Sequence, residues 1–275
     1  MAEETNSTEA KPIRHILALS GGKDSSALAV YMRHRVPDME YVFCDTEKEL
    51  AETYEYLAAL EAYLNKPIHR LTHEQGLGFD DLLKIRRGFL PSPQMRWCTE
   101  YLKIKPYEKY IGTDRVVSYV GIRADEQHRN GYISHRPNIT TRFPFIEDNI
   151  RKQDVERILE ESGLGMPSYY QWRSRSGCFF CFFQQRREWI GLLETHEDLY
   201  REAMKYERTD PATGEQYTWV QGESLADLAD PARIAQVKED YQRRLAREQA
   251  FTPNASLEQV LGESDDGSGC LICHL

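Results

Sequence analysis

Short apolar runs alternate with helical patterns through the first half of the chain. Four runs have the length of a strand, at 16–19, 41–43, 67–71 and 116–120. Helices are predicted over 25–34 and 49–64, and the second has apolar side chains near helical spacing at Leu50, Tyr54, Leu57, Leu60 and Leu64. Helical connections between short strands are typical of a parallel sheet. The pattern therefore predicts the α/β class with a doubly wound parallel sheet.

The second half of the chain is more charged and predicts helices. A short amphipathic helix is expected over 154–162, closed by Gly163, and further helices over 188–208 and 224–250. The last of these is interrupted or begun afresh at Pro231. Their charge predicts a peripheral extension. We therefore divide the chain into a disordered lead-in, an α/β domain, a helical extension and a flexible Cys-containing tail, at 1–12, 13–187, 188–262 and 263–275.

Composition favours a globular protein without a membrane anchor. Of the 275 residues, 40% are hydrophobic, which supports a sizeable core, and no apolar run has the length of a membrane span. The polar stretch 1–11 does not resemble a signal or transit peptide, so we expect a cytoplasmic protein. In that compartment six cysteines, four of them in two Cys-x-x-Cys pairs, favour metal or redox chemistry over structural disulfides.

The net charge of −9 is distributed unevenly. Residues 190–275 carry 8 basic and 17 acidic residues, whereas residues 84–142 carry 12 basic and 5 acidic ones. Four arginines also flank the first Cys-x-x-Cys pair, namely Arg173, Arg175, Arg186 and Arg187. The middle of the chain can therefore face a polyanion, while the C-terminal part cannot. A solvated basic surface without a partner is the alternative.

A glycine-rich turn joins the first strand to the first helix. Its residues, 20–26, are Ser-Gly-Gly-Lys-Asp-Ser-Ser. Two glycines allow a tight turn and close approach of a ligand, and the helix N-terminus favours an anion such as phosphate. Lys23 adds a cation, while Ser20, Ser25 and Ser26 add hydroxyl donors. The glycine spacing and the Lys-Asp pair differ from those of the common P-loop. A plain turn without a ligand is the alternative.

Two further polar clusters follow later strands. Cys44-Asp45-Thr46 ends the second strand, and Gly121-Ile122-Arg123 follows the fourth. Ligands of doubly wound sheets lie outside the carboxyl ends of the strands, so we expect both clusters beside the glycine turn. Ordinary turn chemistry is the alternative for Asp45 and Thr46, and a surface ion pair is the alternative for Arg123.

One Cys-x-x-Cys pair lies within the α/β domain and another lies at the chain end. Cys178 and Cys181 have the spacing that brings two sulfurs to one metal or cluster. Inert thiols in a buried aromatic core are the alternative. Cys270 and Cys273 follow a Ser/Asp/Gly-rich linker, which would let them sweep a wide volume.

The glycine turn resembles the PP-loop, Ser-Gly-Gly-x-Asp-Ser, of the ATP pyrophosphatases. With later motifs, it makes the chain similar to the phosphoadenosine phosphosulfate (PAPS) reductase superfamily. These motifs occur in order between about residues 14 and 187: Phe43–Thr46 with Glu52–Tyr54, Arg96–Thr99 with Leu102-Lys103, Gly121–Arg123 with Asp125-Glu126, Phe143–Phe145, and Ser176–Cys178 with Cys181. The resemblance implies the adenine nucleotide alpha-hydrolase-like form of the doubly wound fold.

The intact loop, together with the lack of a Glu-Cys-Gly-x-His segment, resembles the ATP pyrophosphatases of sulfur insertion more than the true reductases. Within that branch the chain resembles the DndC and SspD type of bacterial DNA phosphorothioation systems, which act in defence. This implies cleavage of ATP to AMP and pyrophosphate, adenylylation of a DNA acceptor, and a cysteine desulfurase as sulfur donor. The alternatives are a phosphoadenylyl or adenylyl sulfate reductase, a PP-loop enzyme of tRNA thiolation, and a non-catalytic adaptor.

The resemblance also implies roles for individual residues. Catalytic roles fall to Lys23, Asp24 and Arg123, with Asp24 also placing Mg²⁺. Contacts to ATP are implied for Ser20, Gly21, Gly22, Lys23, Asp24, Ser25, Ser26, Asp45, Thr46 and Gly121. A 4Fe-4S cluster is implied on Cys98, Cys178 and Cys181, with zinc as the alternative. The related reductases use a tandem Cys-Cys where this chain has Trp97-Cys98, so the fourth position is either open or filled by Cys270 or Cys273.

Overall fold

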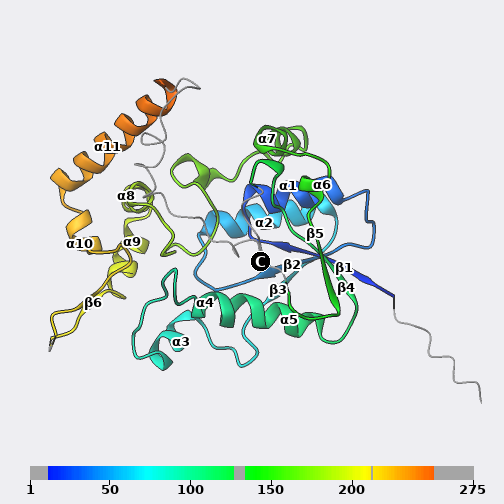
Figure 1. The fold of residues 1–275 in the computed structure, drawn as a ribbon, viewed down its shortest axis with the longest axis horizontal. Coiled ribbons are helices and arrows are strands. Elements are labelled where there is room, and N and C mark those ends of the chain that lie inside the picture. The colour runs from blue at the N-terminus through cyan, green and yellow to red at the C-terminus, as the bar shows by residue number, and fades with distance from the viewer. Residues whose placement is uncertain (1–11, 127–133, 212, 251–275) are drawn as a thin grey trace, which may run out of the picture.

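A five-stranded parallel sheet forms the centre of the protein (Figure 1). The computed structural model describes residues 12–126, 134–211 and 213–250. The strand order is β3-β2-β1-β4-β5, with β1 (Arg14–Leu19), β2 (Glu40–Cys44), β3 (Ile68–Leu71), β4 (Val116–Tyr119) and β5 (Ile139–Arg142). All four pairings are parallel. The predicted α/β class and the doubly wound parallel sheet are confirmed.

Helices cover both faces of the sheet. Leu17 and Leu19 of β1 face α1 (Lys23–Met32), α2 (Ala51–Leu64) and α7 (Lys152–Glu161) in one hydrophobic cluster. Ile16 and Ala18 point to the other face and pack with α5 (Lys105–Ile111). Because successive side chains of a strand alternate between faces, a strand covered on both sides needs a continuous apolar run, which is the pattern of 16–19.

One helical segment combines α-helical and π-helical turns. It begins with α4 (Trp97–Thr99), widens to a π-helical turn over Glu100–Ile104 and continues as α5. The shorter helices α3 (Phe79–Ile85) and α6 (Pro144–Glu147) precede and follow it in the chain, and single 3₁₀ turns lie at Ala124–Glu126 and Ser168–Gln171.

Within the described ranges, every helix is too short or too polar to cross a bilayer.

The C-terminal helices share a hydrophobic core with α3 and with the segment around Phe180. They are α8 (Arg186–Thr195), α9 (Glu197–Met204), α10 (Leu225–Leu228) and α11 (Pro231–Ala250), with a hairpin of β6 (Arg208–Thr209) and β7 (Gln216–Tyr217) between them. Trp189, Tyr200 and Trp219 belong to the same buried cluster as Phe79 and Phe180. The predicted helical C-terminal region is therefore confirmed, its helices share a buried core with α3, and the helix predicted over 188–208 is two helices separated at His196.

Candidate functional site

The glycine turn lies where the strand order of the sheet reverses. From β1 the chain passes to β2 and β3 on one side and later returns to β4 on the other. The carboxyl ends of β1 and β4 therefore meet at the switch point of the sheet, which is the position where doubly wound sheets bind ligands. Ser20 directly follows β1, and Gly121–Arg123 follow β4 after one residue.

The turn itself is stabilised by its own hydroxyls. Gly21 has a left-handed backbone with φ +71°, and Gly22 precedes the first residue of α1. The Ser20 and Ser25 hydroxyls lie 3.1 Å apart, and the Gly22 N–H donates to Ser20 Oγ at 3.3 Å. Ser25 Oγ in turn donates to the Gly22 carbonyl. Polar groups thus converge on the turn, as the sequence predicts, while Ser26 is buried inside α1.

Two tyrosines and a serine from a distant segment cover the turn. Tyr169 donates its hydroxyl to the Gly21 carbonyl at 2.6 Å, and the Lys23 N–H donates to the Tyr170 hydroxyl at 3.1 Å. Ser176 Oγ lies 3.1 Å from Ser20 Oγ. Sequence reasoning missed both tyrosines because no local pattern links them to a turn almost 150 residues earlier. Of the three covering residues, only Ser176 belongs to a motif that the sequence analysis identified.

An ionic cluster joins the turn to the segment after β4. The Asp24 carboxylate accepts from Lys23 Nζ at 3.0 Å and from Arg123 Nη1 at 2.7 Å. Arg123 also pairs with Asp125 at 3.1 Å and with Glu126 at 2.9 Å. Burial disfavours the charge of Arg123, but Asp24 and Glu126 hold the pKa of the guanidinium above its ordinary value. The predicted catalytic trio Lys23, Asp24 and Arg123 is therefore one connected group.

Gly121 lets the two halves of the site approach each other. A Cβ atom at this position would lie 3.0 Å from the carbonyl oxygen of Asp24 and 3.3 Å from the backbone nitrogen of Ser25. These are backbone atoms at the start of α1, so neither can move aside without shifting the helix. The side chain of any other residue would push the β4 segment off the helix N-terminus.

The polar residues after β2, Asp45 and Thr46, lie beside the segment that contains Cys178. Asp45 accepts from the Tyr54 hydroxyl at 2.7 Å and from the Glu47 N–H at 2.8 Å. Thr46 donates to Glu49 at 3.0 Å, and its hydroxyl lies 3.1 Å from the sulfur of Cys178. These contacts connect Thr46 to the Cys-x-x-Cys segment. A role of Asp45 or Thr46 in nucleotide binding stays a prediction.

The cysteines gather around Lys103, which lies in the π-helical turn. Cys178 Sγ is 3.7 Å from Glu49 Oε1, and Cys44 Sγ is 3.5 Å from the Lys103 carbonyl. Burial by itself lowers the pKa of the Lys103 ammonium, but Glu49 and the sulfurs of Cys178, Cys44 and Cys181 raise it above its ordinary value. Glu49 and Lys103 are thus the charged neighbours of the cysteine sulfurs. Of the two, only Lys103 belongs to a motif that the sequence analysis identified.

Burial favours the protonated form of two of the thiols, Cys98 and Cys178. It raises the pKa of Cys98 to about 11 and that of Cys178 well above its ordinary value, and in both cases the Cys181 sulfur adds to the increase. Among the residues that the structure describes, no three His, Cys, Asp or Glu side chains are arranged to hold a metal ion. The soft thiol donors suit an iron–sulfur cluster or zinc. A metal site on Cys98, Cys178 and Cys181 stays a prediction, and Cys270 and Cys273 lie outside the described residues.

Gly21→Ala is expected to destabilise the protein more than Gly163→Ala does. Both glycines have a left-handed backbone, but a Cβ at Gly21 would lie 2.5 Å from Thr53 Cγ2, whereas one at Gly163 has open space. We expect a loss of roughly 1–2 kcal/mol at Gly163 from backbone strain and about 2–4 kcal/mol at Gly21 from strain plus overlap. Urea unfolding measures both. Equal losses would mean that the turn relaxes freely away from Thr53.

The fold and the site together define an α/β protein with a glycine turn at the switch point of its sheet. Residues 14–180 match the phosphoadenosine phosphosulfate reductase domain, so the chain belongs to that family. The matched region contains the glycine turn, the Arg123 segment and Cys178, and it ends one residue before Cys181.

Three sequence relatives carry no functional name. Two are uncharacterized proteins of Methanocaldococcus jannaschii, one 30% identical over 70% of this chain and the other 25% identical over 66%. This chain spans 42% and 45% of their lengths. The third is an uncharacterized 37.8 kDa protein of Escherichia phage 186, 26% identical over 63% of this chain and 68% of its own.

Two solved structures show weaker similarity. A phosphoadenylyl-sulfate reductase from Candida auris in complex with phosphate has a TM-score of 0.48 and 14% identity, and the match covers 61% of this chain and 82% of that chain. A U34-tRNA thiolase, NcsA, from Methanococcus maripaludis with its 4Fe-4S cluster has a TM-score of 0.36 and 11% identity, and the match covers 80% of each chain.

Proposed function

We propose that this protein is an ATP pyrophosphatase, which cleaves ATP to AMP and pyrophosphate and adenylylates an acceptor for sulfur insertion, as in bacterial DNA phosphorothioation. The observation that carries this proposal is the ionic group of Lys23, Asp24 and Arg123 beside a PP-loop at the switch point of the sheet. The intact loop favours ATP over an adenylyl sulfate as the substrate.

When phosphate binds, its oxygens would replace some of the hydrogen-bond partners that the turn now has within itself and in Tyr170. In our account, the pyrophosphate end of ATP takes hydrogen bonds from the backbone of Gly21 and Gly22 and from the hydroxyls of Ser20 and Ser25. Helix α1 adds the positive end of its dipole. Lys23 neutralises the leaving pyrophosphate, and Arg123 faces the α-phosphate. Asp24 holds both cations in place and supplies a carboxylate oxygen for the Mg²⁺ that arrives with ATP.

The chemical step is a substitution at the α-phosphorus. An acceptor oxygen forms a bond to that phosphorus as the bond to the bridging oxygen of the β-phosphate breaks, and pyrophosphate leaves with the electron pair. Such a step needs positioning and charge neutralisation rather than a protein nucleophile. Gly121 lets the backbone approach the nucleotide, and Asp45 and Thr46 contact its adenosine part. The acceptor then carries AMP, which a sulfur nucleophile displaces.

Sulfur handling is assigned to the cysteine side of the site. We propose Cys98, Cys178 and Cys181 as ligands of a 4Fe-4S cluster, with zinc as the alternative metal. When bound, a cluster with one open iron supplies a place to hold a sulfur atom. The Thr46 hydroxyl and Glu49 orient Cys178, while Lys103 places a positive charge beside the sulfurs. The proposed sulfur donor is a cysteine desulfurase, and the proposed acceptor is DNA.

A reconstitution experiment tests the proposed function. Anaerobically purified protein is incubated with ATP, Mg²⁺, a cysteine desulfurase, cysteine and either DNA or tRNA, and sulfur in the nucleic acid is measured by mass spectrometry. We expect ATP-dependent phosphorothioate in DNA. Thiolated tRNA with unmodified DNA would replace the acceptor, and thioredoxin-dependent sulfite release from PAPS would replace the function with that of a reductase.

Deleting residues 264–275 is expected to separate sulfur transfer from ATP cleavage. The deletion removes Cys270 and Cys273 and leaves the glycine turn unchanged. Pyrophosphate release should therefore persist, while sulfur incorporation should fall if these thiols deliver persulfide to the core cysteines. A variant with both cysteines changed to serine is the control that keeps the tail length. Full sulfur incorporation by both variants would leave the core cysteines as the sulfur-handling site.

A further inference from the structure

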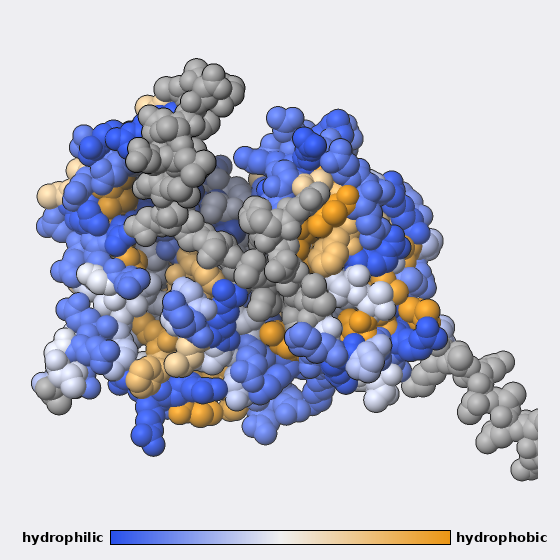
Figure 2. Space-filling view, in the orientation of Figure 1, coloured by the Kyte–Doolittle hydropathy of each residue, from blue (hydrophilic) through white to orange (hydrophobic). Residues whose placement is uncertain are grey.

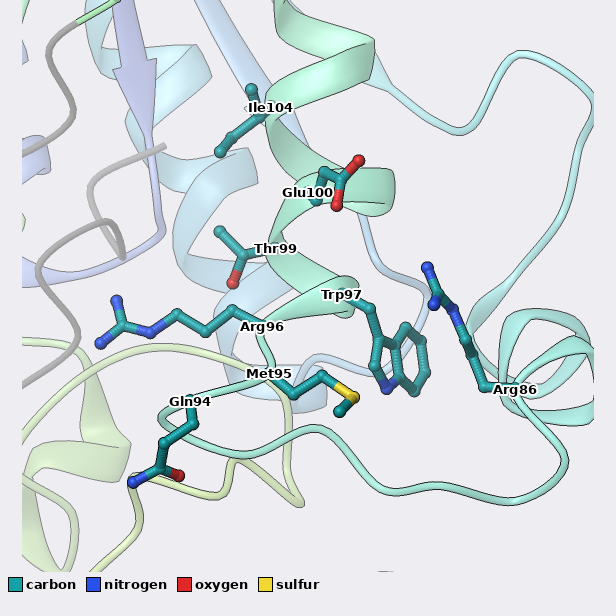
Figure 3. Close-up of a pocket in the computed structure, with 8 residues that line it drawn as sticks. All are labelled: Arg86, Gln94, Met95, Arg96, Trp97, Thr99, Glu100 and Ile104. Atoms are coloured by element: carbon teal, nitrogen blue, oxygen red, sulfur yellow. The ribbon is translucent and has the colours of Figure 1, made fainter.

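A pocket of about 370 Å³ lies between α3 and the start of α4 (Figure 3). Arg86 comes from the end of α3, whereas Met95, Arg96 and Trp97 come from the loop and the first turn of α4. In Figure 3 the Trp97 ring lies between Met95 and Arg86, and Arg96 extends away from the ring on the opposite side. The volume falls within the range of small-ligand sites.

The arginines of this region are held by aromatic rings rather than by carboxylates. The Arg96 guanidinium lies 4.9 Å from the centre of the Phe183 ring, and Arg86 lies 5.3 Å from that of Tyr101. Neither of them, nor the exposed Arg87, forms a salt bridge with any residue that the structure describes. A cation–π contact fixes a guanidinium without neutralising it, so these arginines keep their charge for an anionic partner.

Carboxylates near the pocket already have partners. Glu100 lines the pocket, but Lys105 pairs with it at 2.9 Å, and Asp81 lies 3.7 Å from Lys84. The surface therefore has an excess of positive charge from its arginines. Apolar side chains are also exposed here: Met95 is 49% exposed and Ile85 63% exposed. Figure 2 shows hydrophobic atoms gathered at the lower edge of the molecule, in the region of α3.

The same surface connects to the glycine turn through one segment. Arg175 lies 5.0 Å from the centre of the Phe183 ring, on which Arg96 also lies. The next residue, Ser176, reaches Ser20 Oγ at 3.1 Å. A ligand on Arg96 would thus lie against the segment that covers the turn.

We propose that this surface, formed by Arg86, Arg87, Arg96, Tyr101 and Phe183, binds single-stranded DNA and guides it toward the glycine turn. The proposal rests on the proposed function, because it identifies where the nucleic-acid acceptor binds. Phosphates are paired by the three arginines. Unpaired bases stack on the flat guanidinium groups and on the aromatic side chains, and the pocket beside Trp97 accepts one of them. Bases inside a duplex are already stacked and would gain little from such a surface.

Binding of a fluorescein-labelled, 15-nucleotide mixed-sequence DNA strand tests the proposal. Anisotropy is measured without ATP, on the full chain, at several salt concentrations. We expect Arg86→Ala with Arg96→Ala to weaken binding at least about 10-fold and to flatten the slope of log Kd against log salt by about 0.7 for each arginine removed. Arg96→Lys should keep the salt slope but lose affinity, because lysine lacks the planar group. Arg157→Ala on α7 is the matched control, since Arg157 is exposed and already pairs with Asp154.

Three outcomes would overturn the proposal: unchanged affinity in the double variant, equal or tighter binding of the duplex form of the same strand, or tighter binding of a stem-loop RNA. Pyrophosphate release from ATP, measured on the same proteins, keeps the two hypotheses apart. Wild-type protein that binds the strand through these arginines but does not cleave ATP would reject the proposed function and retain the surface. The reverse result would reject the surface alone.

Discussion

Lys23→Ala is expected to lower pyrophosphate release from ATP by about 100- to 1,000-fold, the usual effect of removing one preorganised charge-stabilising group. Lys23 Nζ lies 3.0 Å from Asp24, whose carboxylate also binds Arg123. The variant therefore removes one of the two cations that offset the phosphate charge. The steady-state rate of pyrophosphate release measures the loss, and circular dichroism checks that the fold is kept.

Two control variants show whether the loss of activity is specific to the charge of Lys23. Lys152→Ala removes an exposed lysine at the start of α7 and should leave the rate unchanged. Lys23→Arg keeps the charge with a different shape, so it should retain more activity than Lys23→Ala. If Lys23→Ala keeps more than half of the wild-type rate, Lys23 does not act on the leaving pyrophosphate, and the ionic group at the turn has a structural role.

Cys98→Ser and Cys178→Ser are each expected to remove nearly all bound metal. Anaerobically purified wild-type protein should carry iron, and loss of one thiolate from a three-cysteine site leaves too few ligands for a stable cluster. Burial raises the pKa of Cys98 to about 11, so metal binding must displace protons. Metal affinity should therefore fall as the pH is lowered. Iron and zinc per chain are measured by elemental analysis.

Cys44→Ala is the matched control for the cysteine variants. Cys44 is buried at the end of β2, and its thiol contacts the Lys103 carbonyl at 3.5 Å, close to the other sulfurs but outside the proposed ligand set. Its metal content should equal that of the wild type. Wild-type protein without iron or zinc, or loss of metal in Cys44→Ala alone, would contradict the assignment of the ligands.

The parts of the fold that the sequence predicts best are those with both faces buried. The buried parts of β1 and β2, at 16–19 and 41–44, are continuous apolar runs, so periodicity and length identify them. β5 was missed because Ile139-Thr-Thr-Arg142 has one apolar residue and an edge position in the sheet. The helix over Phe79–Ile85 was missed because it is short and its buried face has two residues, Phe79 and Leu82.

The candidate site was predictable where a motif is local and not where contacts are distant. The glycine turn follows β1 and Arg123 follows β4. These two strands are neighbours at the switch point, so the strand order alone brings the two segments together. The cover of Tyr169 and Tyr170 depends on how a later loop folds back, which no spacing encodes. The helical character of the C-terminal region was predictable from its pattern, whereas its shared core with α3 was not, because that core depends on a few large buried aromatic side chains such as Trp189 and Trp219.

The products of ATP cleavage test the central claim most directly. Purified protein is incubated with ATP and Mg²⁺, and the nucleotides are separated by chromatography while pyrophosphate and phosphate are assayed independently. A PP-loop enzyme with Lys23, Asp24 and Arg123 around the glycine turn should give AMP and pyrophosphate in equal amounts. ADP and phosphate as the products would contradict the account, because they require attack at the γ-phosphorus instead of the α-phosphorus.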